Sequence, residues 1–129
     1  LIVTTPLTRA IQTMLAAFCD HPAPRLVEPL HREYLDSFCD VGSSPSVLAA
    51  AFPTLRFDHL DDPWWYVAPN APPPFAREDI DHFEARVESF RRWLAARPET
   101  TIAVVGHSTF LRRLTGMPFA NAQRVIVTM

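Results

Sequence analysis

The sequence predicts an α/β fold with a mostly parallel sheet, and three features of its 129 residues support this prediction. Two short apolar runs, residues 1–4 and 101–105, each lead into a segment with helical spacing. Between them, residues 78–97 carry apolar side chains at helical intervals. Short apolar runs that alternate with helices are typical of parallel strands covered on both faces. The length suits one domain, so we expect residues 1–129 to form a single unit.

The first corner of the predicted fold begins with a strand at residues 1–4. Thr5 and Pro6 then have the character of a helix start, with Thr5 as the N-cap and Pro6 in the first helical position. Apolar residues follow at helical spacing: Leu7, Ile11, Met14, Leu15 and Phe18. Residues 25–28 are expected to form a short edge strand, because Pro29 opposes a longer one.

The middle of the chain is less regular. Residues 30–45 are polar, and a short helix is expected to start at Ser44 or Ser46 and to run to Phe52. A long loop follows at residues 53–77. A loop of that length in a compact domain is usually functional or disordered.

Two clusters stand out in this loop. One is rich in proline, at Pro69 and residues 72–74. The other is Trp64-Trp65-Tyr66, which either lines a substrate entrance or pins the loop by packing against the core.

The second half of the chain is predicted to contain a long helix and a last strand. The helix spans residues 78–97, and its apolar residues step by three or four positions: Ile80, Phe83, Val87, Phe90 and Leu94. The opposite face is charged and is expected to be solvated: Glu84, Glu88, Arg91 and Arg92. Pro98 ends this helix. The last strand is expected at residues 124–128, after a break at Gly116.

The second corner is the most informative part of the sequence. The strand at residues 101–105 runs into Gly106, His107 and Ser108, and a helix is expected from Ser108 to about Thr115. Ligands of open α/β sheets bind at the carboxyl ends of the strands, which is where His107 stands. Ser108 is suited to cap the helix that follows.

The two corners together predict a phosphate site. If their strands are parallel neighbours, the corners lie side by side at one edge of the sheet. Each helix start offers backbone N–H groups, which attract anions. Arg9 lies in the first turn of its helix, and an arginine forks onto two phosphate oxygens better than a lysine does. We therefore expect a phosphate pocket built from Arg9, His107 and the two helix N-termini.

Composition argues against several classes of function. The formal net charge of −2 gives no strong attraction to nucleic acid or to an anionic membrane. No apolar run approaches the roughly 18 residues of a membrane span, and the sequence shows no signal peptide. Cys19 and Cys39 make no disulfide framework or zinc motif, which suits a reducing, cytoplasmic location. The histidines lack metal-ligand spacing, so we expect no metal site.

Three segments of the chain match the motifs of a known family. Residues 3–13 (VTTPLTRAIQT) resemble a segment of the form SPLxRAxQT, and residues 104–112 (VVGHSTFLR) resemble a segment of the form VVSHGGFLR. Residues 30–33 (LHRE) resemble an LxE element that supplies an acid. Residues 39–43 and 62–65 resemble a subgroup of uncharacterised members. In this order and spacing, the segments resemble the histidine phosphatase superfamily, the phosphoglycerate mutase-like proteins.

This resemblance implies a fold and a chemistry. The fold would be a three-layer α/β/α sandwich with a mostly parallel sheet, incomplete here at the N-terminus and at the C-terminus. The family transfers or hydrolyses phosphoryl groups through a phosphohistidine, without a metal or another cofactor. By resemblance, Arg9 would bind the phosphoryl oxygens, and His107, with Ser108 beside it, would bind the same group and stabilise its charge. Glu33 would protonate the leaving oxygen and later activate water.

Two other carboxylates compete with Glu33 for the role of the acid. They are Glu28 and Asp36, which lie close to it in the sequence. Only Glu33 matches the family element, so the resemblance favours it.

The chain departs from the family in one large respect, because it contains no Arg-His-Gly motif. That motif carries the nucleophilic histidine at the end of the family's first strand. No histidine of this chain stands between an arginine and a glycine: His21, His31, His59, His82 and His107. We therefore expect a partial domain that lacks the nucleophile and its strand. Smaller departures are Thr5 for the usual serine and Ser108 for the usual glycine.

We expect a phosphomonoester hydrolase that acts on a phosphorylated small molecule, with the 129-residue chain inactive alone. A hydrolase is favoured over a mutase because the long insertion of the glycolytic mutases is not evident between residues 19 and 78. The alternative is a catalytically inactive member that binds phosphorylated ligands or a protein partner. The sequence specifies neither the substrate nor the oligomeric state.

Overall fold

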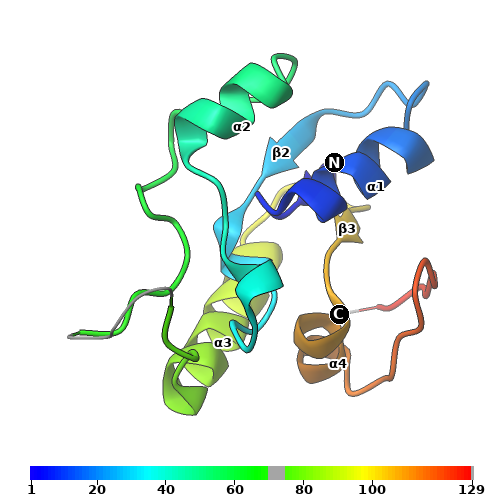
Figure 1. The fold of residues 1–129 in the computed structure, drawn as a ribbon. Helices are drawn as coiled ribbons and strands as arrows, with labels where there is room; N and C mark the ends of the chain where they lie inside the picture. Colours follow the sequence, from blue (N-terminus) through cyan, green and yellow to red (C-terminus); the bar gives the residue numbers. More distant parts are fainter. Residues whose placement is uncertain (70–74, 129) are drawn as a thin grey trace.

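Three parallel strands form the centre of the structure, a computed structural model that describes residues 1–69 and 75–128 (Figure 1). The strands are β1 (Ile2–Thr4), β2 (Arg25–Val27) and β3 (Ala103–Val105). β1 lies in the middle, and the register aligns Thr4 with Val27 and Val105, so the three strands end level. The predicted parallel sheet is confirmed, and β2 lies at its edge.

Four α-helices of the described residues pack against this sheet (Figure 1). They are α1 (Thr8–Ala17), α2 (Pro45–Ala51), α3 (Ile80–Ala95) and α4 (Ser108–Thr115), with single 3₁₀ turns at η1 (Pro29–His31) and η2 (Phe38–Asp40). Ala103 and Val105 pack against the core cluster to which α1 and α2 contribute, whereas Val104 packs against the cluster of α3 and α4. Neighbouring residues of a strand point to opposite faces of a sheet. A pair of helices therefore covers each face, which gives the α/β/α layers that the sequence predicts.

Each face of the sheet has its own apolar core. The core under α1 and α2 is the larger one: Ile2, Leu7, Ile11, Met14, Val27, Leu48, Leu55, Phe57 and Trp64. The core under α3 and α4 is rich in phenylalanine: Phe83, Val87, Phe90, Phe110 and Leu114. Full burial of one large apolar side chain contributes about 1.5–3 kcal/mol, so these clusters are the main source of stability. Trp64 is 5% exposed, which agrees with a packing role for the aromatic cluster of the long loop.

The first helix begins later than the sequence predicts. α1 starts at Thr8, and its N-cap is Leu7 rather than Thr5. Thr5 instead follows β1 directly, and Pro6 and Leu7 form the bend that leads into α1. Thr5 is fully buried and its hydroxyl bonds to His107, so it is not available to cap the helix.

α3 is also shorter than predicted, and its apolar face is narrower. Asp79 caps the helix by accepting hydrogen bonds from the amides of Asp81 and His82, so the first helical residue is Ile80. Ile80 is 56% exposed, although the sequence pattern assigns it to the core. The residue before the cap, Glu78, is buried instead.

The strand predicted at residues 124–128 is not formed. These residues are exposed and have no strand assignment, and Ile126 is 90% exposed. In Figure 1 the red segment that precedes residue 129 loops outward on the side of α4. Within residues 1–69 and 75–128 the segment pairs with neither β2 nor β3, the two edge strands of the sheet, and a lone strand has no partners for its N–H and C=O groups. The proline run at residues 72–74 lies outside the described residues.

Candidate functional site

The two predicted corners meet at the carboxyl ends of β1 and β3. The two strands are parallel neighbours, so Thr5 and Gly106 both follow the same end of the sheet. Nε2 of His107 lies 2.7 Å from the hydroxyl of Thr5, and both side chains are buried. The structure therefore brings the first corner and the second corner into direct contact.

The environment of His107 keeps its imidazole neutral. The pKa of His107 is lowered to about 3, mainly because the ring is buried and also because of the positive charges of Arg9 and Arg86. Burial favours the neutral form, and nearby cations oppose a further positive charge. At neutral pH this ring can therefore donate one hydrogen bond and accept another.

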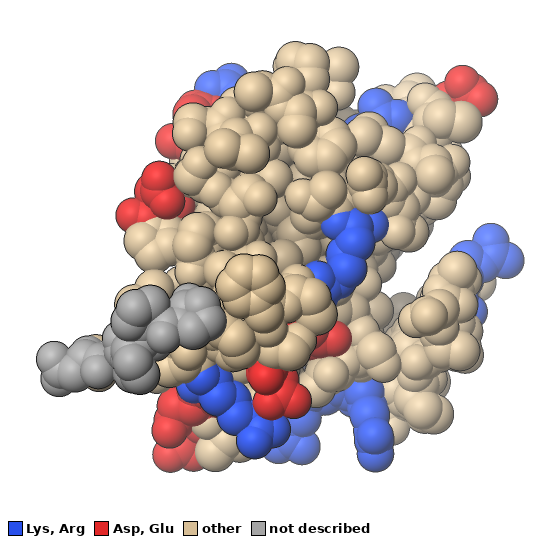
Figure 2. Space-filling view, in the orientation of Figure 1, with Lys and Arg blue, Asp and Glu red and all other residues tan. Residues whose placement is uncertain are grey.

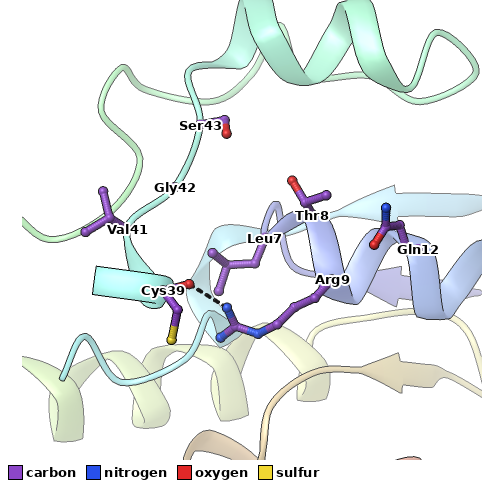
Figure 3. A pocket seen from close by; sticks show the side chains of 8 residues that line it. All are labelled: Leu7, Thr8, Arg9, Gln12, Cys39, Val41, Gly42 and Ser43. Atoms are coloured by element: carbon purple, nitrogen blue, oxygen red, sulfur yellow. Dashed lines mark hydrogen bonds between the residues drawn. The ribbon is translucent and has the colours of Figure 1, made fainter. Parts of the chain in front are cut away.

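Arg9 lies in the first turn of α1, and two groups of the segment 37–43 hold its guanidinium. Nη1 donates to the carbonyl of Cys39 at 2.6 Å, as Figure 3 shows, and Nη2 donates to Oδ1 of Asp40 at 2.8 Å. The Asp40 carboxylate is in turn held by the Ser37 amide at 3.2 Å. The Arg9 side chain remains 45% exposed, so its charge is oriented by Asp40 and still reaches solvent.

A cleft of about 290 Å³ opens beside Arg9. The first turns of α1 form one wall, and the chain after η2 forms the other (Figure 3). Its lining is mixed in character: Leu7, Thr8, Arg9, Gln12, Cys39, Val41, Gly42 and Ser43. Trp64 supports the second wall from behind, because its indole N–H donates to the Ser43 carbonyl at 2.8 Å and its ring lies against Gly42.

Glu33 lies at the amino end of α4, the helix that follows His107. Its Oε2 accepts a hydrogen bond from the amide of Thr109 at 3.2 Å, and its Oε1 accepts one from the amide of Phe110 at 3.1 Å. Oε1 also accepts from the amide of Tyr34 at 2.9 Å. The N-terminus of α4 was expected to offer free N–H groups to an anion, and this part of the expectation is wrong, because Glu33 already binds two of them.

The two rival carboxylates lie in other environments. Glu28 caps η1 by accepting from the amide of Leu30 at 2.9 Å. Asp36 forms an exposed ion pair with Arg77 at 2.7 Å. Neither has a hydrogen bond to α4 among the described residues. Of the three carboxylates, Glu33 is therefore the one bonded to the helix whose N-cap is His107.

Ser108 does not cap α4. His107 is the N-cap residue, and Ser108 is the first residue of the helix. The Ser108 hydroxyl donates to the carbonyl of Phe119 at 3.2 Å, which ties the start of α4 to the chain that follows it. The capping acceptor is the carboxylate of Glu33, which comes from a distant part of the sequence and for that reason was not predicted as a cap.

Sequence reasoning missed two parts of this site. Asp40 orients Arg9, and its signal is the pattern Ser37-x-x-Asp40, a capping-box spacing in which the two side chains bond to each other. Arg86 and Glu78 form a buried ion pair behind Glu33, at 2.7 Å. The signal for Arg86 is its position, because it follows Phe83 by three residues and so lies on the apolar face of the predicted helix.

Three further observations concern the surface charge, the metal-binding groups and the helices. In Figure 2 basic and acidic side chains are interspersed, and no large area of this face carries a single sign of charge. Over residues 1–69 and 75–128, no group of three or more His, Cys, Asp or Glu is placed to hold a metal ion. None of the helices described is both long enough and apolar enough to span a membrane.

The chain is similar in sequence to known proteins. A family model described as the histidine phosphatase superfamily (branch 1) matches residues 1–128. The chain is also similar to a phosphoglycerate mutase-like protein of Arabidopsis thaliana, with 30% identity over 146 aligned positions. That alignment covers 88% of this chain and 51% of the relative, so the chain spans about half the length of the relative that it matches.

Proposed function

Because the chain belongs to the histidine phosphatase superfamily, we propose that it supplies the phosphate-binding and proton-transfer groups of a phosphomonoester hydrolase. The reaction would pass through a phosphohistidine, as the family resemblance implies. The observation that carries the proposal is the contact between the two corners, where the Thr5 hydroxyl and Nε2 of His107 lie 2.7 Å apart. This contact, together with the hydrogen bonds from Thr109 and Phe110 to Glu33, supports a single pocket to which Arg9, His107 and Glu33 all contribute.

In the proposed pocket, Arg9 and His107 bind the transferred phosphoryl group. Arg9 is preoriented by Asp40 and keeps an exposed surface, so its guanidinium can approach phosphoryl oxygens at little cost in side-chain entropy. His107 is neutral and buried, and a hydrogen bond from its ring to a phosphoryl oxygen would strengthen in a site from which water is excluded. Both groups would stabilise the charge that spreads over the phosphoryl oxygens during transfer.

Glu33 is proposed as the acid and the base. Its Oε2 accepts one hydrogen bond, from Thr109, whereas Oε1 accepts two, so Oε2 is the oxygen with capacity to carry a proton. Glu33 would give that proton to the leaving oxygen of the ester. It would then take a proton from the water that attacks the phosphohistidine, which releases phosphate and restores the carboxyl group.

The nucleophile is proposed to come from outside these 129 residues. No histidine of the chain lies between an arginine and a glycine, which is the arrangement of the family nucleophile. A histidine nucleophile divides the reaction into two easier steps, one that forms the phosphorus–nitrogen bond and one that hydrolyses it. The substrate would be a phosphorylated small molecule, and hydrolysis is favoured over mutase activity because no long insertion is evident between residues 19 and 78.

The missing Arg-His-Gly motif also favours a second candidate function. A family member without a nucleophile would bind phosphorylated ligands or a protein partner through the same pocket and would not turn them over. The reading frame before Leu1 separates the two candidates. An in-frame Leu-x-Arg-His-Gly supports the enzyme, and a start codon at Leu1 excludes it.

The test of the proposed enzyme uses the full-length protein and an aryl phosphate. Arg9→Ala and His107→Ala should each lower kcat/KM by at least about a hundredfold, the usual cost of removing a group that stabilises transition-state charge. Arg112→Ala, on the exposed side of α4, is the matched control and should retain turnover. If Arg9→Ala and His107→Ala also retain turnover, the proposed pocket is wrong.

A further inference from the structure

Arg86 is a buried cation that takes no direct part in the proposed reaction. It lies on α3 and is 4% exposed, and its guanidinium packs 5.2 Å from the ring centres of both Phe83 and Phe110. Glu78 balances its charge, accepting from Nε at 3.0 Å and from Nη2 at 2.7 Å. A buried charge persists only where it is paired and hydrogen-bonded, so this environment is specific for a guanidinium group.

The remaining donors of Arg86 hold the segment that carries Glu33. Nη1 donates to the carbonyl of Leu30 at 2.8 Å and to that of Arg32 at 2.7 Å. Nη2 donates to the carbonyl of Glu33 itself at 3.3 Å. Together with the two bonds to Glu78, all five N–H groups of the guanidinium have acceptors. Three carbonyls within four consecutive residues are therefore fixed by one side chain.

Glu33 extends this arrangement to α4. Its carboxylate binds the amides of Thr109 and Phe110, the second and third residues of the helix that His107 caps. Phe110 contacts both residues, because its amide donates to Glu33 and its ring lies against the guanidinium of Arg86. A shift of Arg86 would thus move the carboxylate and the amino end of α4 relative to each other.

We propose that Arg86 is a positioning residue, which holds the backbone of residues 30–33 and thereby sets the Glu33 carboxylate at the amino end of α4, next to His107. The catalytic consequence rests on the proposed function, whereas the positioning itself does not depend on turnover. A lysine could pair with Glu78, but its single nitrogen has three donors and cannot also reach three carbonyls.

The direct test follows the amide proton shifts of Thr109 and Phe110 as pH titrates the carboxylate that they bind. Arg86→Lys in the full-length protein keeps the charge beside Glu78 and should retain the fold, yet it should reduce the amplitude of this titration by at least half. Arg91→Lys is the matched control, because Arg91 also lies on α3 and donates to a carbonyl of α4, that of Leu114. An amplitude that is unchanged in Arg86→Lys overturns the proposal.

If Arg86→Lys does not fold, the same amide titration can be made on a second variant. The variant Arg86→Gln leaves Glu78 with an ion-pair partner, because Nη2 of Arg32 lies 3.4 Å from Oε1 of Glu78. It lacks the guanidinium of Arg86, so the amide titration should show the same loss of amplitude. An amplitude equal to that of the unaltered protein would again overturn the proposal.

Turnover of an aryl phosphate gives an independent readout. Arg86→Lys should lower kcat roughly tenfold to a hundredfold at unchanged KM, which is the scale expected when a catalytic group is misplaced by about 1 Å. In a Glu33→Gln background Arg86→Lys should lower kcat only slightly further, because the carboxylate that Arg86 positions is already absent. Equal losses in both backgrounds overturn positioning through Glu33. If Glu33→Gln alone retains full turnover, Glu33 is not the acid and base of the proposed function. The amide titration then still tests whether Arg86 positions the Glu33 carboxylate.

Discussion

The hydroxyl of Thr5 lies 2.7 Å from Nε2 of His107, across 102 positions of the sequence. Both side chains are buried where neighbouring parallel strands end. The contact orients the imidazole of His107, and it also explains why Thr5 does not cap α1. One hydrogen bond therefore links the first family segment to the second.

Replacement of Thr5 by valine should measure the contribution of this bond. Valine keeps the shape of threonine and leaves the buried Nε2 of His107 without a partner, so we expect the free energy of unfolding to fall by about 1–3 kcal/mol. Thr5→Ser keeps the hydroxyl and should lose less. Urea unfolding followed by circular dichroism compares the two variants, and equal losses would show that the hydroxyl is not responsible.

Two buried histidines should make the fold sensitive to acid. The pKa of His31 and that of His107 are each lowered to about 3, mainly by burial, whereas an unfolded histidine titrates near 6.5. Between these values the unfolded chain binds protons that the folded chain excludes, so stability is fully present above pH ~6.5 and declines as the pH falls towards ~3.

His107→Gln tests this pH dependence. The variant cannot take up the proton, so the slope of unfolding free energy against pH, measured between about pH 4.5 and 6, should decrease by about 1.4 kcal/mol per pH unit. Gln12→Asn, an exposed replacement that involves no titratable group, is the control and should keep the original slope. An unchanged slope in His107→Gln would mean that His107 is protonated in the folded state over this range.

Asp40 has two effects on Arg9 that substitutions can separate. It orients the guanidinium, and its negative charge opposes the binding of an anion. Asp40→Asn keeps an oxygen acceptor and removes the charge, so inorganic phosphate should bind several-fold more tightly. Asp40→Ala removes the acceptor as well, and phosphate should bind less tightly than to Asp40→Asn. Calorimetry measures both dissociation constants, and tighter binding to the alanine variant would exclude the orienting role.

Gly42 provides a test of the cleft wall. A Cβ atom at this position would overlap the indole of Trp64, which is 5% exposed and cannot move freely. Gly42→Ala should therefore lower the free energy of unfolding by about 1–3 kcal/mol. A double variant that also carries Trp64→Phe should lose less than the sum of the two single changes. Strictly additive losses would contradict a direct contact between the two residues.

The sequence predicted those elements whose signal is local. β1, β3 and α4 follow from short apolar runs and from the Gly106-His107-Ser108 corner, and the structure places them close to the predicted residues. The strand expected at residues 124–128 has the right composition. It is not formed because strand pairing depends on a neighbour, which an apolar pattern cannot specify.

The long-range contacts of the site were beyond local pattern reasoning. Thr5 is a good N-cap by composition, yet a residue 102 positions away takes its hydroxyl. Glu33 caps α4 from 76 positions away, and Arg86 occupies a core position because three carbonyls and Glu78 surround it. Each of these outcomes depends on tertiary contacts that override local preference.

The central claim is that Arg9 and His107 bind one phosphate group together, and an NMR titration tests it most directly. The imidazole nitrogen signals of His107 are followed in the full-length protein as inorganic phosphate is added. We expect phosphate to shift these signals and to raise the pKa of His107 from about 3, because a bound anion favours the protonated ring. Arg9→Ala should raise the half-saturating phosphate concentration about tenfold or more, as expected for the loss of a charge-assisted hydrogen bond. Phosphate that leaves the His107 signals unchanged, or a midpoint that does not respond to Arg9→Ala, would contradict the claim.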